Sequence, residues 1–266
     1  MAIITISRGT FAGGATLAAM LGERLNYRIV SRELLFDRVR DTFGIVQRQL
    51  EDMMDKPPAL FDPAAKATGR RVLTAMQASL CELIGEDDAV YHGNVGHLFF
   101  PGVFHVLSVR LIAPRAARVE LCMEREHLNE FEASRRIDQV DAERARWARY
   151  FYGVDVADPS LYDMVFNLEA ASLDDACECV AYTAKLPSFT ASDKSRKRLK
   201  DLTLASRVRA KLLLDPSTHD LDVHVEADCG RVRLSGLVSQ EHYEQVTAAV
   251  RGLPGVSKIE TAQAVK

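Results

Sequence analysis

The sequence predicts an α/β protein with a parallel sheet covered by helices on both faces, followed by a small α+β domain. Three observations support this prediction. A β-branched run at residues 3–6 is typical of an inner parallel strand that is buried on both faces. Strand and helix patterns then alternate up to about residue 186. After a polar, basic stretch, a new pattern in the order αββαβ begins at residue 203.

Composition limits the classes of function. The chain has 266 residues and a formal net charge of −3, so two domains of ordinary size are expected and no overall basic field favours nucleic acid. No apolar run approaches the roughly 18 residues of a membrane span, and Arg8 comes too early for a secretory signal. The cysteines and histidines lack metal-ligand spacing. We therefore expect a cytoplasmic protein without a nucleic-acid partner, and a homo-oligomer stays open.

A loop of small residues follows the first strand and leads into a helix. Its members are Arg8, Gly9, Thr10, Phe11, Ala12, Gly13, Gly14, Ala15 and Thr16. Such residues let backbone amides approach an anion, and the helix N-terminus favours negative charge. The pattern G-x-x-x-x-G-K-[ST] is nevertheless incomplete, because Ala15 or, in another register, Gly14 stands where lysine belongs. The loop predicts a degenerate phosphate site; the alternative is a strand-to-helix turn without a ligand.

The other elements of the first domain follow from periodicity, caps and breaks. Strands are expected at residues 27–30, 89–92 and 162–168 and within 103–112, and helices at 31–43, 47–55, 64–84, 115–149 and 172–186. Ser31 is an N-cap candidate, Pro57-Pro58 breaks the helix before it, and Ser172 with Asp175 forms a capping box. The polar loop at Gly93-Asn94 falls on the usual ligand edge of a parallel sheet.

Arginines are concentrated in the segment 115–149. Arg135, Arg136, Arg144, Arg146 and Arg149 lie there together with Asp141. One interpretation is a helical lid whose arginines close over phosphates. The other is a solvated helix surface with i,i+4 ion pairs, and the sequence does not decide between them.

Residues 187–202 have the composition of a linker. Serine and threonine are followed by Lys194, Arg196, Lys197, Arg198 and Lys200, with few apolar anchors. We expect a solvated basic tether that separates a domain at 1–186 from a second domain at 203–266. The second domain has helical patterns near 204–212 and 240–251, a hairpin around Asp228-Cys229-Gly230, and a last strand at 256–262.

The first domain resembles the cytidylate kinase-like family, a branch of the P-loop nucleoside monophosphate kinases. The resemblance rests on ISRGTFAGGATLA at the start, SRELL at 31–35, VYHGNVG at 90–96, VLSVRLIAPRAARVE at 106–120, and the segment from Ile137 to Asn167 with its D-x-x-R and Y-D-x-x-x-N motifs. Members of this branch commonly carry a double glycine where the lysine is expected. The resemblance implies a P-loop kinase-like fold with an arginine-rich lid.

Roles for individual residues follow from that resemblance. It implies ATP and Mg²⁺ as cofactors, with Thr16 as the metal ligand and residues 8–16 around the nucleotide phosphates. It implies catalytic lid arginines, which are Arg135, Arg136, Arg144 and Arg149. It places an acceptor at Ser31, Arg32, Gly93 and Asn94. The chain departs from the branch at Phe11, Ser31 and Asn94, and an asparagine offers only neutral hydrogen bonds where an arginine would grip a phosphate.

Residues 203–266 look like a BON domain, a small αββαβ module of bacterial proteins associated with lipids or other small ligands. The carriers are GRVRLSG at 230–236 and LPGV at 253–256. Together the two resemblances predict a nucleotide-binding protein with slow or absent turnover, a pseudokinase, fused to a ligand-binding or regulatory domain. An active ATP-dependent phosphotransferase is the alternative, and a structural or oligomerising protein is the second.

Overall fold

The computed structural model describes residues 1–50, 63–85, 87–93, 95–237 and 239–261. Its larger sheet has the order β2-β3-β1-β4-β5, and every neighbouring pair is parallel. The strands are β1 (Ile3–Arg8), β2 (Arg28–Val30), β3 (Ala89–His92), β4 (Val106–Ile112) and β5 (Met164–Asn167). Because β1 lies in the middle, the loop that follows it is at the centre of the carboxyl edge of the sheet.

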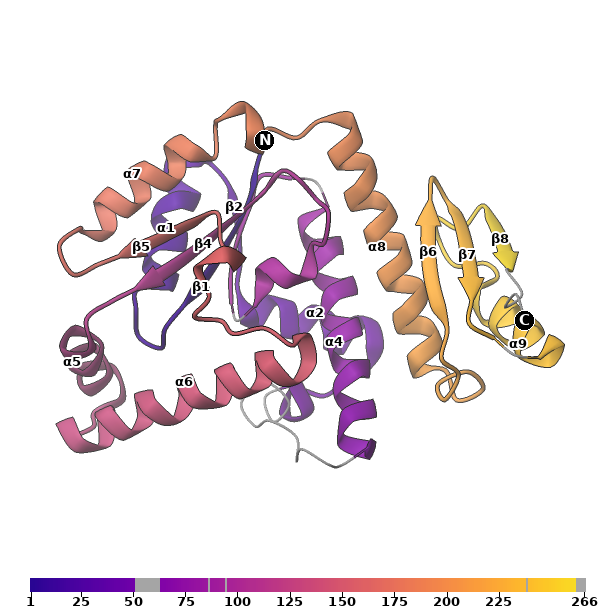
Figure 1. The fold of residues 1–266 in the computed structure, drawn as a ribbon, viewed down its shortest axis with the longest axis horizontal. Coiled ribbons are helices and arrows are strands. Elements are labelled where there is room, and N and C mark those ends of the chain that lie inside the picture. The colour runs from indigo at the N-terminus through magenta and orange to yellow at the C-terminus, as the bar shows by residue number, and fades with distance from the viewer. Residues whose placement is uncertain (51–62, 86, 94, 238, 262–266) are drawn as a thin grey trace.

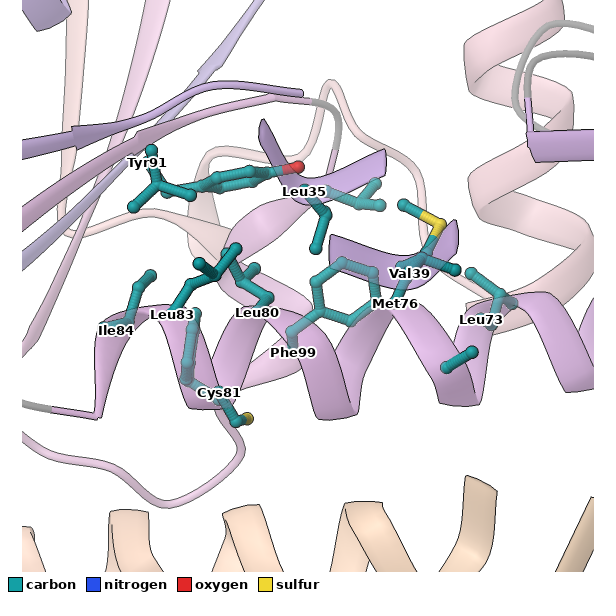
Figure 2. Close-up of a cluster of buried hydrophobic side chains, with 14 of the residues drawn as sticks. Leu35, Val39, Leu73, Met76, Leu80, Cys81, Leu83, Ile84, Tyr91 and Phe99 are labelled. Carbon is teal, nitrogen blue, oxygen red and sulfur yellow. The ribbon is translucent and has the colours of Figure 1, made fainter. Parts of the chain in front are cut away.

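Helices cover both faces of this sheet, as predicted (Figure 1). They are α1 (Gly14–Leu25), α2 (Arg32–Phe43), α4 (Pro63–Ile84), α5 (Arg115–Glu126), α6 (Glu130–Tyr152) and α7 (Leu173–Thr183). Ile3 packs in a core with α2 and α4, whereas Ile4 and Ile6 pack with α1 and α7. Figure 2 shows part of the first core, with Tyr91 at its sheet side. The alternation of β1 side chains between two covered faces explains why residues 3–6 are all buried.

Several boundaries differ from the predicted ones. The region 115–149 contains two helices, because His127 adopts a left-handed φ of 55° and Asn129 starts α6 with a capping box to Glu132. β4 begins at Val106, inside the segment 103–112 that was expected to contain it. Of the helix predicted at 47–55, residues 47–50 are helical and the rest lies outside the described residues, as does Pro57-Pro58.

The C-terminal part has the predicted order αββαβ. Its elements are α8 (Asp193–Leu214), β6 (His224–Asp228), β7 (Arg231–Ser235), α9 (Gln240–Val250) and β8 (Lys258–Thr261). β6 pairs antiparallel with β7, and β7 pairs parallel with β8. The core lies between the sheet and one side of the two helices, with Val208, Val232 and Val246 completely buried.

Residues 187–202 differ from the expected solvated tether. Pro187–Phe189 form a 3-10 turn, and residues 193–202 are the first part of the continuous helix α8, which packs along α4. Leu199 and Leu202 are buried in the core of the large sheet. Figure 1 shows α8 between that sheet and β6. The basic composition hid this role because the cations point outward and two leucines suffice to anchor the helix. The domain limits at 186 and 203 stay a prediction.

Buried hydrogen bonds also attach the start of α8. His105 lies between Asp87 and Ser195, with a distance of 2.9 Å from its Nε2 to Asp87 Oδ1 and a hydrogen bond from its other side to Ser195. Arg196 Nε donates to Asp87 Oδ2 at 2.8 Å. These residues form a Ser–His–Asp chain, but Ser195 and His105 are closed to solvent, so the chain holds α8 in place and reaches no substrate.

Candidate functional site

A cleft of about 240 Å³ opens at the loop between β1 and α1. Seven of the nine predicted loop residues line it, namely Arg8, Thr10, Phe11, Gly13, Gly14, Ala15 and Thr16. Its other walls come from the start of α2 and from α5 and α6. Ala12 is buried beneath the turn, and Gly9 lines an adjoining cleft of about 220 Å³ that shares Arg8 and Arg144 with the first. The predicted phosphate loop is therefore the floor of a cleft.

Arg8 occupies the space that Gly14 leaves open. A Cβ placed on Gly14 would overlap Arg8 Cδ and lie 2.6 Å from Arg8 Nε. The arginine at the end of β1 thus lies across the first residue of α1, beside the position where the lysine is missing. Among the described residues, none accepts a hydrogen bond or forms an ion pair with its guanidinium. Burial, and next the positive charge of Arg32, lower the pKa of Arg8.

Thr10 connects the loop to α5 and α6. Its amide donates to Asp141 Oδ1 at 2.9 Å, and Arg118 Nε donates to its carbonyl oxygen at 2.7 Å. Arg118 also pairs with Asp141, and Arg144 Nη1 donates to Thr10 Oγ1 at 3.0 Å. Burial alone would raise the pKa of the Asp141 carboxyl, but these hydrogen bonds hold it below its ordinary value. The D-x-x-R motif therefore fastens the arginine-rich helix to the loop.

Phe11 adopts a left-handed backbone conformation with φ of 59°, which disfavours a side chain of this size. Its ring packs against a small apolar cluster between α5 and α6 that includes Cys122 and Ile137. This contact offsets part of the strain. The ring still lines the cleft, so Phe11 both narrows the cleft and joins the loop to the helical wall.

The cleft is mainly positive. Arg8, Arg32, Arg125, Arg136 and Arg144 line it, against Glu126 and Glu143. Glu126 lies 3.4 Å from Arg136 and Glu143 accepts a hydrogen bond from Gln139. Because the cations outnumber the carboxylates, the cleft favours an anion with several charges. Sequence reasoning missed Arg118 and Arg125. They are seven residues apart and so share one face of α5, which was the available signal.

The predicted acceptor residues have varied surroundings. Ser31 caps α2 by accepting a hydrogen bond from the Leu34 amide, and Arg32 lines the cleft over the Phe36 ring. Gly93 is needed for space, because a Cβ there would overlap the Tyr91 hydroxyl. Asn94 lies outside the described residues. Among the acceptor residues that the structure describes, Arg32 alone lines the cleft.

Two of the four predicted catalytic arginines lie away from the cleft. Arg135 lies over the Phe131 ring, and Arg149 pairs with Asp155 at 3.2 Å.

The Y-D-x-x-x-N motif makes structural contacts between strands. Tyr162 Oη donates to the Val156 carbonyl at 2.9 Å and accepts from Arg110, and Asp163 accepts from the Ser108 amide and hydroxyl. It fastens the edge strand β5 to its neighbour β4.

The residues fit a magnesium ion carried by phosphates. Thr16 is exposed on the first turn of α1, and its hydroxyl makes no hydrogen bond within the described ranges. Mg²⁺ at phosphate sites takes few protein oxygens and keeps several waters. Elsewhere, Asp201, Asp228 and Cys229 cluster at ligand spacing, but Lys197 already pairs with both carboxylates. We therefore assign no metal there.

None of the helices in the described ranges is long and apolar enough to cross a membrane.

Residues 3–170 match the model of the cytidylate kinase-like family, and residues 200–265 match that of the BON domain. A cytidylate kinase of Methanosarcina acetivorans is 26% identical over 168 residues, covering 62% of this chain and 87% of that protein. A cytidylate kinase of Sulfolobus acidocaldarius is 25% identical over 179 residues, covering 66% and 91%.

The chain is also similar to solved structures. An uncharacterized protein from Eubacterium ventriosum aligns with a TM-score of 0.55 at 18% identity, covering 69% of this chain and 97% of that one. A shikimate kinase from Bacteroides thetaiotaomicron aligns with a TM-score of 0.43 at 14% identity, covering 70% and 99%. At these identities the first alignment bears on the fold alone.

Proposed function

Because the chain belongs to the cytidylate kinase-like family and carries a C-terminal BON domain, we propose that residues 1–186 bind a nucleoside triphosphate through its phosphates. The phosphates lie on the loop at residues 8–16, and Arg8 supplies the cation that lysine supplies in other P-loops. Phosphoryl transfer is slow or absent. The BON domain serves as a ligand-binding or regulatory unit, for a small ligand or a lipid.

The observation that carries this proposal is the position of Arg8 over Gly14. A half-buried guanidinium that forms no ion pair within the described part of the chain is costly, and an anion in the cleft compensates that cost. Guanidinium groups bind phosphate bidentately, which suits the crowded end of β1. The amides of the Gly13-Gly14 turn and the N-terminus of α1 add partial positive charge at the same place.

The side chains around the loop would divide the work as follows. Arg8 and Arg144 hold and orient the phosphates, and Arg32, Arg125 and Arg136 contribute positive charge from the opposite walls. Asp141 and Arg118 keep the loop in register with α6 through Thr10. Thr16 would hold magnesium, which neutralises phosphate charge when bound.

Slow or absent turnover is favoured because few of the expected transition-state contacts are available. Arg135 and Arg149 are engaged elsewhere, and Arg136 lies beside Glu126. Removing one charged interaction from a water-excluded site typically costs roughly 3 kcal/mol of transition-state stabilisation. Binding can survive such losses, whereas turnover falls about 100-fold for each. The alternative, an active kinase for a nucleotide or another small acceptor, is favoured by Arg144 and Arg32 lining one cleft.

Calorimetry tests the binding proposal. ATP and GTP are titrated with Mg²⁺ into the full chain, and nucleoside monophosphates are titrated alone and with ATP. We expect ATP binding at millimolar concentration or better, weakened at least tenfold by Arg8→Ala and unchanged by Arg38→Ala. Arg38 is a matched control because it is exposed on α2 and does not line the cleft. Failure of both ATP and GTP to bind would leave the structural or oligomerising role as the better account.

An ADP-formation assay over the same panel separates the two remaining alternatives. Binding without ADP above a protein-free control supports the pseudokinase. ADP formation that Arg144→Ala abolishes, while Arg38→Ala leaves it intact, supports an active phosphotransferase. The acceptor that gives the largest kcat/KM then identifies the substrate.

A further inference from the structure

The loop after β1 is bound by a carboxylate of the protein itself. Asp141 of α6 accepts a hydrogen bond from the Thr10 amide through Oδ1, at 2.9 Å. Its other oxygen, Oδ2, accepts a hydrogen bond from the guanidinium of Arg118 on α5. A backbone amide beside a guanidinium is also the kind of donor pair that binds a phosphate oxygen. Asp141 therefore occupies donors of the type that an incoming phosphate needs.

Arg118 lies directly against the start of the loop. A Cβ placed on Gly9 would be 3.1 Å from Arg118 Cζ, so the guanidinium rests on the glycine backbone. Arg118 Nε donates to the Thr10 carbonyl oxygen at 2.7 Å, which fixes the group in this place. The charge of this half-buried cation is compensated by Asp141. Its Nη2 group becomes available to a phosphate only when the Asp141 carboxylate moves away.

Asp141 also places a negative charge beside the proposed phosphate site. Asp141 and Arg144 are three residues apart and share one face of α6, and Arg144 Nη1 donates to Thr10 Oγ1 at 3.0 Å. Both side chains line the cleft of about 220 Å³ that shares Arg8 and Arg144 with the loop cleft. A carboxylate in this position repels a second anion that approaches the same arginines.

The Asp141 side chain is charged at neutral pH and can be reached from solvent. Burial favours its neutral form, but the hydrogen bonds from Thr10 and Arg118 keep the pKa of the carboxyl below its ordinary value. The side chain is 34% exposed, so the carboxylate can change partners without opening the core. An anion from solvent can therefore compete with it for the loop.

We propose that Asp141 forms an autoinhibitory contact, in which an internal carboxylate occupies the loop at residues 8–16 and a phosphate must displace it in order to bind. This regulation rests on the proposed function, because it acts on the loop assigned to the nucleotide phosphates. With Asp141 in place, α6 is held onto Thr10. A phosphate on the loop takes over the Arg118 guanidinium and breaks that connection.

Calorimetry of the full chain with pyrophosphate tests this contact separately from nucleotide recognition. We expect Asp141→Asn to bind pyrophosphate about tenfold tighter than the unaltered protein, the factor that applies if the contact is closed about nine-tenths of the time. Asp138→Asn is the matched control, because Asp138 is an exposed aspartate of the same helix that pairs with Arg115 and lines neither of the two clefts. Its affinity should stay within about twofold. Equal or weaker binding by Asp141→Asn, or no binding by either protein, would overturn the proposal.

Trp147 gives a second measurement that needs no variant. It is the only tryptophan of the chain, and it is buried on α6 six residues after Asp141. We expect saturating pyrophosphate to change the fluorescence of Trp147 in the unaltered protein, because α6 loses its connection to Thr10. Asp141→Asn should show a smaller change, since the contact is already weakened. Unchanged fluorescence at saturation would mean that Asp141 stays in place, against the proposal.

Titrations of the same proteins with ATP and Mg²⁺ separate this proposal from the proposed function. If Asp141→Asn binds pyrophosphate tighter but neither ATP nor GTP binds to either protein, the autoinhibitory contact stands and the nucleotide function fails. If ATP binds to the unaltered protein and Asp141→Asn tightens neither ATP nor pyrophosphate, the nucleotide site stands and the autoinhibitory contact is wrong.

Discussion

Replacing Gly14 by alanine separates the stability of α1 from the function of the loop. Gly14 is the first residue of α1 and has an ordinary helical backbone, so alanine fits the backbone. In a helix this change normally stabilises by roughly 0.5–1 kcal/mol. The new Cβ would, however, overlap the side chain of Arg8 and force it to leave its position. The variant should therefore fold at least as well and bind nucleotide worse.

The size of the binding effect follows from the hydrogen bond that a displaced Arg8 can no longer make to a phosphate. A hydrogen bond to a charged group contributes about 1.5–3 kcal/mol, and each 1.4 kcal/mol is tenfold in affinity. We expect Gly14→Ala to weaken ATP binding by about 10- to 100-fold in calorimetry. The melting temperature should stay equal or rise.

A double-mutant cycle decides whether the effect runs through Arg8. If alanine at 14 acts by displacing Arg8, the combination with Arg8→Ala should bind ATP no worse than Arg8→Ala alone. Additive losses would mean that the methyl group blocks the phosphate directly. ATP binding within twofold of the unaltered protein for Gly14→Ala would refute the assigned role of Arg8.

Three further predictions concern the lid, pH and α8. Asp141→Asn should lower the free energy of unfolding by about 1–3 kcal/mol in denaturant unfolding. This is less than the cost of breaking a fully buried ion pair, because the Asp141 side chain is 34% exposed. An unchanged unfolding midpoint would contradict the role of Asp141 in holding Thr10 and Arg118 together. Burial, with Arg110 nearby, lowers the pKa of His97 to about 4, so the folded protein binds fewer protons than the unfolded chain between pH 6.5 and 4. The free energy of unfolding should therefore fall by up to roughly 3 kcal/mol as the pH is lowered from 6.5 to 4. His97→Phe should flatten this part of the stability profile, and an equally steep profile would assign the effect to other groups. Leu202→Ala should lower the free energy of unfolding by about 2–4 kcal/mol. It should also speed the chemical modification of the Cys81 thiol, whose pKa burial raises to about 12, while the exposed Cys179 and Cys229 react as before. If Cys81 stays equally protected, α8 is not the element that covers it.

Local patterns were enough to predict most of the elements. The β-branched run at Ile3–Ile6, the Ser31 cap, the Ser172 and Asp175 capping box, and the αββαβ order all follow from side chains close together in sequence. The loop at residues 8–16 was likewise visible, because the need for glycine and a helix start is local. Such features depend on backbone preferences that a residue carries with it.

The tertiary structure decided which side chains contact the loop and which arginines line the cleft. Arg8 lies over Gly14, Arg118 reaches Thr10 from another helix, and only Arg136 and Arg144 of the four predicted lid arginines line the cleft. A long side chain can swing several ångströms from its backbone, so composition gives its charge but not its target. The same reason explains α8, where Leu199 and Leu202 among many cations turn an expected tether into a packed helix. The sequence thus determined which charged and loop-forming residues this protein has, and packing between distant segments determined which of them come together in the cleft.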